Sequence, residues 1–300
     1  MMGVRGGRAV LAAATVLGLL GAAKAEPISV TDAFGRRVTV PAPPQRIVTI
    51  FSSNVELIAA LGLTDRIVGI EAFTRYPPEV IGRPLVGGRL GFSVDAVVGL
   101  KPDLLVVTPA REAAHTLVDP MERLGIPIVV LTGRTVAEIL HNIRLLGQLT
   151  GVPERGEAVT AKLEARLADV AERTKGREGP RAVMVRGRVG NGLLLVARPD
   201  TYTGDAMVLA GGRFALENRG PISQVSPEAI INSDPDVLLF AGSQAELDDM
   251  ISRPGWSTMR AVRTKRVHTV SRAEFLIPGP RTFDGIERLA ALFHPTAFGK

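Results

Sequence analysis

The chain has 300 residues, no cysteine and a formal net charge of +6, and its hydrophobic fraction of 46% is enough to bury the cores of about two domains. The lack of cysteine excludes disulfide scaffolds, thiolate metal sites, cysteine nucleophiles and a lipid anchor on a lipobox cysteine. Arg5, Arg8 and Lys24 lie near the N-terminus, and the other basic residues are scattered among acids, so we expect no nucleic-acid partner.

Residues 1–25 have the features of a cleavable signal peptide. Arg5 and Arg8 precede an apolar run from Ala9 to Ala22, and Ala23-Lys24-Ala25 has the small residues that signal peptidase recognises. An uncleaved membrane anchor is the alternative, but the run is shorter than the roughly 20 residues that span a bilayer. We therefore expect an exported, unlipidated protein in a Gram-negative periplasm, monomeric and not embedded in the membrane.

Short apolar runs alternate with amphipathic segments after an opening hairpin around residues 32–35. This alternation is typical of parallel sheets flanked by helices, and predicts an α/β fold. The expected strands are residues 47–51, 67–70, 104–107, 127–131, 181–185, 193–196, 237–240 and 267–270.

The helix expected over residues 153–176 differs from its neighbours, because its apolar positions form one narrow stripe among charges. Its length of about 35 Å would let it run along two lobes, although an ordinary surface helix of a single domain would have the same pattern. The predicted division is an N-terminal α/β lobe at 26–152, a connecting helix at 153–176 and a C-terminal α/β lobe at 177–300, with both lobes doubly wound.

An internal echo supports two related lobes. Residues 93–107 align without a gap on residues 226–240, and both segments read as a capping serine, a short helix, a Pro-Asp turn and a buried strand. Capping and turn chemistry alone favour this order of residues, but the register holds throughout, which favours duplication.

The sequence contains no constellation that indicates an enzyme or a resident cofactor. It has no G-x-S-x-G elbow, no Walker loop and no H-E-x-x-H motif. The four histidines lie far apart, without metal-ligand spacing, and of these we keep only His115, next to a strand end, as a candidate ligand contact.

The loops that follow the predicted strands are rich in arginine and carry a few aromatic residues. Ligands of open α/β sheets bind beyond the carboxyl ends of the strands, so these loops are the candidate site. Converging guanidinium groups would suit an anionic ligand with apolar parts, although surface loops of an arginine-rich protein carry arginine anyway. The candidates are Ser53, Asn54, Arg75, Tyr76, Arg89, Phe92, Arg111, Arg186, Arg272, Phe275 and Arg281.

Several phrases, in order along almost the whole mature chain, resemble the periplasmic binding proteins of cobalamin and ferric-siderophore ABC importers. They lie at residues 44–48, 54–63, 65–69, 100–104, 124–127, 226–229 and 280–281. The resemblance implies two lobes joined by one long helix, a ligand clamped between them with modest opening, and an ABC permease dimer as partner. It also implies two surface glutamates, Glu79 and Glu228, that dock on permease arginines. Glu228 would in addition stabilise its own helix N-terminus.

The ligand is where the sequence departs from the cobalamin binders, because the chain has one Trp and two Tyr where they have aromatic boxes. This favours a ferric siderophore or a similar anionic iron chelate. Haem, cobalamin and an oxyanion remain alternatives, haem with Tyr76, Tyr202 or His115 as axial ligand. Tyr202 and Trp256 complete the predicted ligand-binding residues, and a secreted enzyme or a sensor on the same scaffold is the alternative class.

Overall fold

The computed structural model describes residues 26–88, 91–108, 114–216 and 224–299. The predicted signal peptide, Arg89 and Arg111 lie outside these residues. The predicted opening hairpin is present: β1 (Ile28–Thr31) pairs antiparallel with β2 (Arg37–Val40). Asp32 at its turn is buried and accepts hydrogen bonds from the backbone and side chain of Arg36, which fixes the turn.

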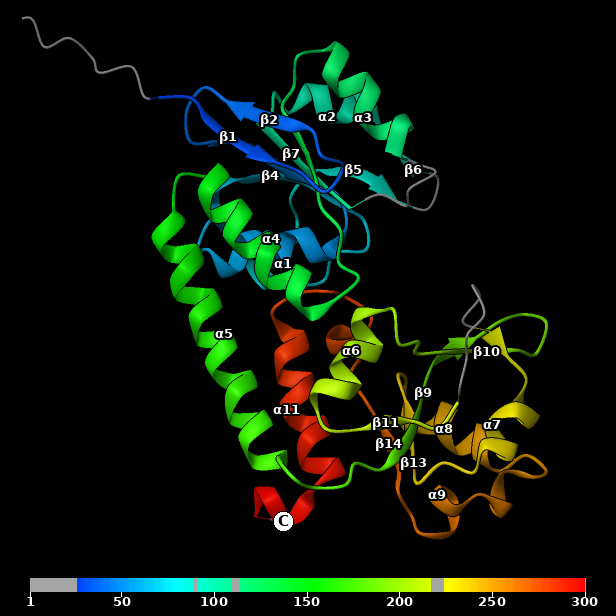
Figure 1. The fold of residues 1–300 in the computed structure, drawn as a ribbon. Coiled ribbons are helices and arrows are strands. Elements are labelled where there is room, and N and C mark those ends of the chain that lie inside the picture. The colour runs from blue at the N-terminus through cyan, green and yellow to red at the C-terminus, as the bar shows by residue number, and fades with distance from the viewer. Residues whose placement is uncertain (1–25, 89–90, 109–113, 217–223, 300) are drawn as a thin grey trace, which may run out of the picture.

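The N-terminal lobe is built on a six-stranded sheet in the order β6-β5-β4-β3-β7-β8 (Figure 1). Its strands are β3 (Ile47–Thr49), β4 (Ile67–Glu71), β5 (Leu85–Gly88), β6 (Gly91–Phe92), β7 (Leu104–Val107) and β8 (Ile128–Val130). All pairs are parallel except β5 with the short edge strand β6. The central strands β3 and β7 are buried along their whole length, as expected for a sheet covered on both faces.

The helices of this lobe are α1 (Ser52–Ala60), α2 (Val94–Gly99), α3 (Ala114–Arg123) and α4 (Val136–Leu149). α4 begins directly after Thr135, whose side chain accepts a hydrogen bond from the backbone N–H of Glu138. The apolar face of α4 contains Ile139, Ile143 and Leu146, all of them fully buried.

The predicted charged helix is α5 (Pro153–Thr174), which runs from the N-terminal lobe along the C-terminal lobe (Figure 1). It packs against α4 at one end and against α11 (Arg281–Phe293) further along. Proline at its first position suits a helix start, because that N–H has no partner within the helix. Leu163 and Val170 form part of its single buried stripe.

The C-terminal lobe contains the second sheet, in the order β12-β10-β9-β13-β14, with β11 also paired to β9. The strands are β9 (Arg181–Arg188), β10 (Leu194–Val196), β11 (Arg213–Phe214), β12 (Gln224–Val225), β13 (Val237–Phe240) and β14 (Val267–Thr269). Its remaining helices are α6 (Tyr202–Leu209), α7 (Pro227–Ser233), α8 (Gln244–Ile251), α9 (Arg260–Arg263) and α10 (Arg272–Phe275). β10 runs antiparallel to both neighbours, so this sheet is mixed rather than purely parallel.

The echo in the sequence corresponds to the same structural unit in both lobes. Ser93 caps α2 and Ser226 caps α7, each accepting a hydrogen bond from the backbone N–H three residues on. At the aligned positions after these helices, Lys101 and Asp234 both have positive φ, 48° and 39°.

The aligned aspartates of this unit also have the same role. Asp103 accepts a hydrogen bond from the backbone N–H of Arg46, just before β3, and Asp236 accepts one from Arg181 at the start of β9. Each carboxylate therefore fixes the start of the strand beside its own, which is the behaviour expected of a repeated helix-to-strand unit.

One hydrophobic core runs through both lobes. It joins Ile47 and Leu104 of the first sheet to Met184 and Leu239 of the second through the helices between them. Two smaller clusters cover the outer faces of the sheets. Because the lobes share buried side chains, their junction is a packed interior rather than a flexible linker.

Candidate functional site

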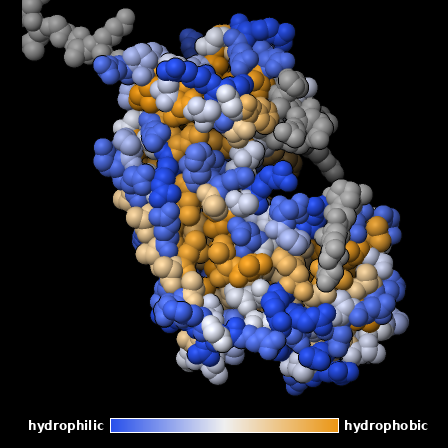
Figure 2. Space-filling model, in the orientation of Figure 1, coloured by the Kyte–Doolittle hydropathy of each residue, from blue (hydrophilic) through white to orange (hydrophobic). Residues whose placement is uncertain are grey.

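The candidate site is the hollow between the two lobes, which opens on the side away from α5 (Figure 2). The carboxyl end of the first sheet reaches the second lobe there. A Cβ added at Gly133, after β8, would lie 2.9 Å from the ring of Pro278. Arg134 and Asp200 approach to 3.9 Å across the same junction. The loops at the carboxyl ends of both sheets therefore border the hollow, where ligands of such sheets bind.

Three of the predicted arginines combine a position at these strand ends with the absence of an acidic partner. Arg75 follows β4, Arg186 lies near the end of β9, and Arg272 follows β14. Within the described part of the chain, none of the three forms an ion pair with a carboxylate. Arg75 and Arg272 donate to backbone carbonyl oxygens. Nε of Arg186 is buried without a hydrogen-bond partner, and its guanidinium lies near the hydroxyl of Tyr202. These guanidinium groups can bind an anion at a lower cost than arginines already paired with acids.

Two exposed phenylalanines at the carboxyl ends of the N-terminal sheet were not among the predicted site residues. Phe51 follows β3 with 36% of its surface exposed, and Phe73 follows the neighbouring strand β4 with 56% exposed. Phe51 has φ 79° and ψ 135°, a backbone conformation that is unfavourable for any residue except glycine. Their positions directly after two adjacent strands were the signal that could have identified them. Exposed rings beside unpaired cations can bind a ligand that is both anionic and apolar.

Several predicted ligand residues lie in the interior of this structure, where other residues surround them. Asn54 is fully buried and donates to the carbonyl oxygens of Ile50 and Val106. Phe275 and Trp256 are 1% and 2% exposed, and Trp256 packs in the core of the C-terminal lobe. Ser53 is also buried, at 6%. Small or apolar side chains near a strand end can pack inward as readily as outward, which a sequence alone does not distinguish.

Tyr202, one of the predicted axial haem ligands, has its hydroxyl engaged in this conformation. Its hydroxyl is 3.0 Å from the carbonyl oxygen of Phe275 and donates a hydrogen bond to it. Burial raises the pKa of Tyr202 to about 12, although Arg186 nearby opposes the shift. The phenol is therefore neutral at neutral pH, and its proton is already engaged.

The structure brings Arg281 and Tyr76 together, but the guanidinium and the ring contact each other rather than an open site. The guanidinium carbon of Arg281 lies 4.3 Å from the centre of the Tyr76 ring. The same guanidinium forms a bidentate ion pair with Glu56, so Arg281 is not a free cation for a ligand. Phe92 is half-buried on β6, and the side chain of His115 lies outside the described residues.

The two predicted docking glutamates are exposed, one on each lobe. Glu79 lies in the helical turn Pro78–Val80. Glu228 lies in the first turn of α7, where its own backbone N–H and the hydroxyl of Ser226 hold its pKa below the ordinary value of 4.5. Glu228 is therefore ionised at neutral pH.

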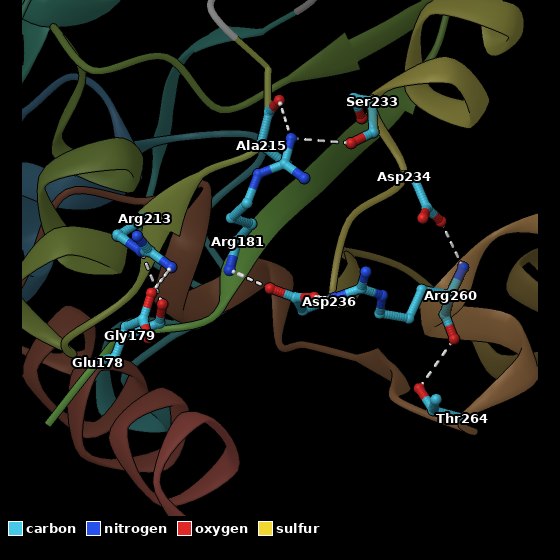
Figure 3. A network of polar contacts seen from close by, with 10 residues as sticks. All are labelled: Glu178, Gly179, Arg181, Arg213, Ala215, Ser233, Asp234, Asp236, Arg260 and Thr264. Atoms are coloured by element: carbon cyan, nitrogen blue, oxygen red, sulfur yellow. Dashed lines mark hydrogen bonds and ion pairs between the residues drawn. The ribbon is translucent and has the colours of Figure 1, made fainter.

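A polar network anchors the far end of α7 (Figure 3). Arg181 donates to the carbonyl oxygen of Ser233, the last residue of this helix. Asp234 and Asp236, just beyond it, accept hydrogen bonds from the backbone and the side chain of Arg260. These hydrogen bonds hold α7, and with it Glu228, in a fixed position on the lobe.

The described residues contain no group of three or more His, Asp or Glu side chains placed to hold a metal ion. Among the same residues no helix is long and apolar enough to cross a membrane. The chemistry of the site is that of binding by cations and aromatic rings.

A model of periplasmic binding proteins matches residues 47–273, which is most of the chain. The chain belongs to the periplasmic binding protein family. Like its relatives, this binding protein is a substrate-binding component of transport systems rather than an enzyme.

Curated relatives cover nearly the whole of this binding protein. A cobalamin-binding protein of Halobacterium salinarum is 30% identical over 282 residues, 90% of this chain and 75% of that protein. An ABC transporter substrate-binding lipoprotein of Bacillus subtilis, YvrC, is 26% identical over 277 residues, 91% of this chain and 87% of that protein.

Solved structures have the same fold. The periplasmic heme-binding protein RhuT from Roseiflexus sp. RS-1 superposes with a TM-score of 0.72 at 26% identity, over 84% of this chain and 99% of that chain. A periplasmic heme-binding protein from Pseudomonas aeruginosa has the same TM-score of 0.72 at 28% identity, over 84% and 94%. The predicted two-lobed α/β fold and the predicted family are confirmed.

Proposed function

We propose that this binding protein captures an anionic iron chelate of the ferric-siderophore type between its lobes and delivers it to an ABC importer. The observation that carries the proposal is a set of three guanidinium groups, at the strand ends that border the hollow, that form no ion pair with a carboxylate of the described residues: Arg75, Arg186 and Arg272. Arginine binds oxyanions through charge-assisted hydrogen bonds, and unpaired arginines do so without first losing an acid.

Haem is the second candidate, and the exposed rings of Phe51 and Phe73 favour it. A flat, largely apolar macrocycle with carboxylates would use both the rings and the arginines. Two of the similar solved structures are named as haem-binding proteins. With Tyr202 engaged by a backbone carbonyl, an axial ligand would have to come from another residue.

Delivery would involve the permease of the importer. The exposed carboxylates of Glu79 and Glu228 would each meet a basic side chain of one permease subunit, one for each lobe. We also propose that residues 1–25 direct export to the periplasm and are removed, leaving a protein without a lipid.

The test is a calorimetric and spectrophotometric titration of the purified mature protein with a ferric catecholate complex, haemin and cyanocobalamin. The proposal expects saturable binding of the ferric complex, weakened about 10- to 100-fold by Arg186→Gln or Arg272→Gln, because a hydrogen bond to a charged group contributes about 1.5–3 kcal/mol.

Arg188→Gln is the matched control. Arg188 already pairs with Asp249 at 2.8 Å, so its substitution should leave the affinity for the ligand unchanged. Binding of haemin alone would select the second candidate, and no saturable binding of any probe would refute the proposed ligand class. Emission of Trp256 is a poor readout, because that side chain is 2% exposed within the C-terminal lobe.

A further inference from the structure

A bidentate ion pair joins the lobes at the junction between them. Nε and Nη2 of Arg281, at the start of α11, lie 3.0 and 2.5 Å from the two carboxylate oxygens of Glu56 on α1. The Glu56 side chain is 1% exposed, whereas that of Arg281 is 25% exposed. A buried carboxylate that loses its cationic partner is strongly disfavoured, so separating α1 from α11 is costly unless water replaces the guanidinium.

Two further contacts enclose this pair. The ring of Tyr76 covers the guanidinium of Arg281 at 4.3 Å. On the other side, the backbone of the C-terminal lobe comes so close at Gly279 that an added Cβ would lie 3.0 Å from Oε2 of Glu56. Glu56 thus contacts one short segment of the opposite lobe, Gly279–Arg281, and the cation of Arg281 lies between a carboxylate and an aromatic ring.

The same groups line a cavity of about 340 Å³ that also includes Glu79. Tyr76 and Glu79 belong to one short segment, with Tyr76 facing Arg281 and Glu79 exposed at the rim. A partner that engages Glu79 therefore acts on a segment that is in direct contact with the interlobe ion pair.

We propose that Glu56, Arg281 and Tyr76 form an interlobe clasp that sets the separation of the lobes, and that docking at Glu79 loosens it. Glu56 and Arg281 are positioning residues for ligand capture: they hold the strand-end arginines of the two lobes at the distance a ligand needs. Docking and the positioning role in ligand capture rest on the proposed function, whereas the effect of the clasp on the separation of the lobes does not.

The experiment measures the distance between the lobes directly. The chain has no cysteine, so Asp95→Cys on α2 and Ala245→Cys on α8, both exposed, introduce the only sites for spin labels. In the labelled protein without ligand we expect one narrow distance distribution. Glu56→Gln and Arg281→Gln should shift it outward and broaden it, and Arg281→Lys should restore it in part because the charge remains.

The matched control is Arg288→Gln. Arg288 lies on the same helix and also pairs in a bidentate manner with a largely buried carboxylate, that of Glu274, but within one lobe. Its loss should leave the distance unchanged. The double variant Glu56→Gln/Arg281→Gln leaves no unpaired buried charge, so it should fold even where the single variants do not, and an unchanged distance in the folded double variant would overturn the clasp.

Two variants test the link to docking. Tyr76→Phe keeps the ring over Arg281 and should behave as the parent protein, whereas Tyr76→Leu should broaden the distribution in the same direction as Arg281→Gln. An unchanged distribution in Tyr76→Leu would refute the connection between the docking segment and the clasp. Since the distances need neither ligand nor permease, they remain informative if none of the ligand probes binds.

The rate of ligand release is a second measurement, which tests whether the clasp affects ligand binding. For a probe that binds the parent protein, clasp variants should release it about tenfold faster, within the range of coupling between distant sites, while Arg288→Gln should not. Faster release in Arg288→Gln as well would mean that general destabilisation is the cause, which would contradict a specific positioning role.

Discussion

The carboxylate of Asp205 in the C-terminal lobe accepts a hydrogen bond of 2.7 Å from the backbone N–H of Val136, at the start of α4 in the N-terminal lobe. The first N–H groups of a helix have no partner within it, so this residue acts as a cap supplied by the other lobe. Asp205 thereby ties α6 to α4, at the junction between the lobes.

The Asp205→Ala variant should be less stable than the parent protein by about 1–2 kcal/mol, the usual loss for a helix cap, and Asp205→Asn should lose less because its amide oxygen still accepts the bond. Urea denaturation followed by far-UV circular dichroism measures both. Asp248→Ala is the control, since its carboxylate contacts only Gln244 on the same exposed helix face. Equal losses in Asp205→Ala and Asp248→Ala would contradict the capping role.

Charge reversal at Glu79 or Glu228 should abolish most ligand import while leaving binding to the purified protein intact, because both carboxylates are exposed and neither is among the proposed ligand-binding residues. The measurement pairs uptake by cells with titration of the same variants. Glu154→Arg is a close control: Glu154 follows the first proline of α5 just as Glu228 follows the first proline of α7. Full import by both docking variants would exclude these glutamates as permease contacts.

The free energy of unfolding should depend on pH through the ion pairs of Arg166. This side chain on α5 binds Glu287 and Asp284 on α11, and its hydrogen bonds hold the pKa of Glu287 below the ordinary value of 4.5. A carboxyl whose pKa is lower in the folded than in the unfolded state stabilises the fold above the unfolded value, and this contribution is lost as the pH falls through the folded value.

Arg166→Gln should therefore reduce stability at about pH 7 and have a progressively smaller effect as the pH falls below the ordinary value of 4.5 and through the folded pKa of Glu287. Urea midpoints over this range test the prediction. Arg177→Gln removes an exposed guanidinium that contacts a backbone oxygen and Thr296, and should leave the pH profile unchanged. A constant difference between Arg166→Gln and the parent at all pH values would rule out the titration of Glu287 as the cause.

Phe51 should be one of the few positions where glycine is better tolerated than alanine. At φ 79° an alanine retains the steric conflict of the Cβ, whereas glycine does not, so Phe51→Gly should be more stable than Phe51→Ala by about 1 kcal/mol. Phe73, which is not among the residues with positive φ, should show the ordinary order, with alanine at least as stable as glycine. Chemical denaturation of the glycine and alanine variants at both positions measures these differences in stability.

The sequence predicted local features well. Strands such as Leu104–Val107 and Val237–Phe240 coincide with their apolar runs, and the serines at 93 and 226 cap the helices that the echo implied. Such features depend on neighbours a few residues away, so the order of residue types is sufficient to identify them.

The candidate site was harder to predict, because it depends on contacts between distant segments. Arg281 pairs with a carboxylate 225 residues away, and nothing near Arg281 in the sequence indicates that its charge is already satisfied. Whether Trp256 packs inward and Phe51 stays exposed depends on the facing sheet and helices, which only the folded chain defines.

The hydrophobic core shared by the two lobes makes their folding interdependent. Leu104 of one sheet and Leu239 of the other lie in a single buried cluster that also includes Leu163 of α5. Neither lobe has a complete interior of its own, so neither should survive as a folded fragment when the other is lost. A protease that cuts one lobe should therefore unfold the whole protein instead of leaving the other lobe folded.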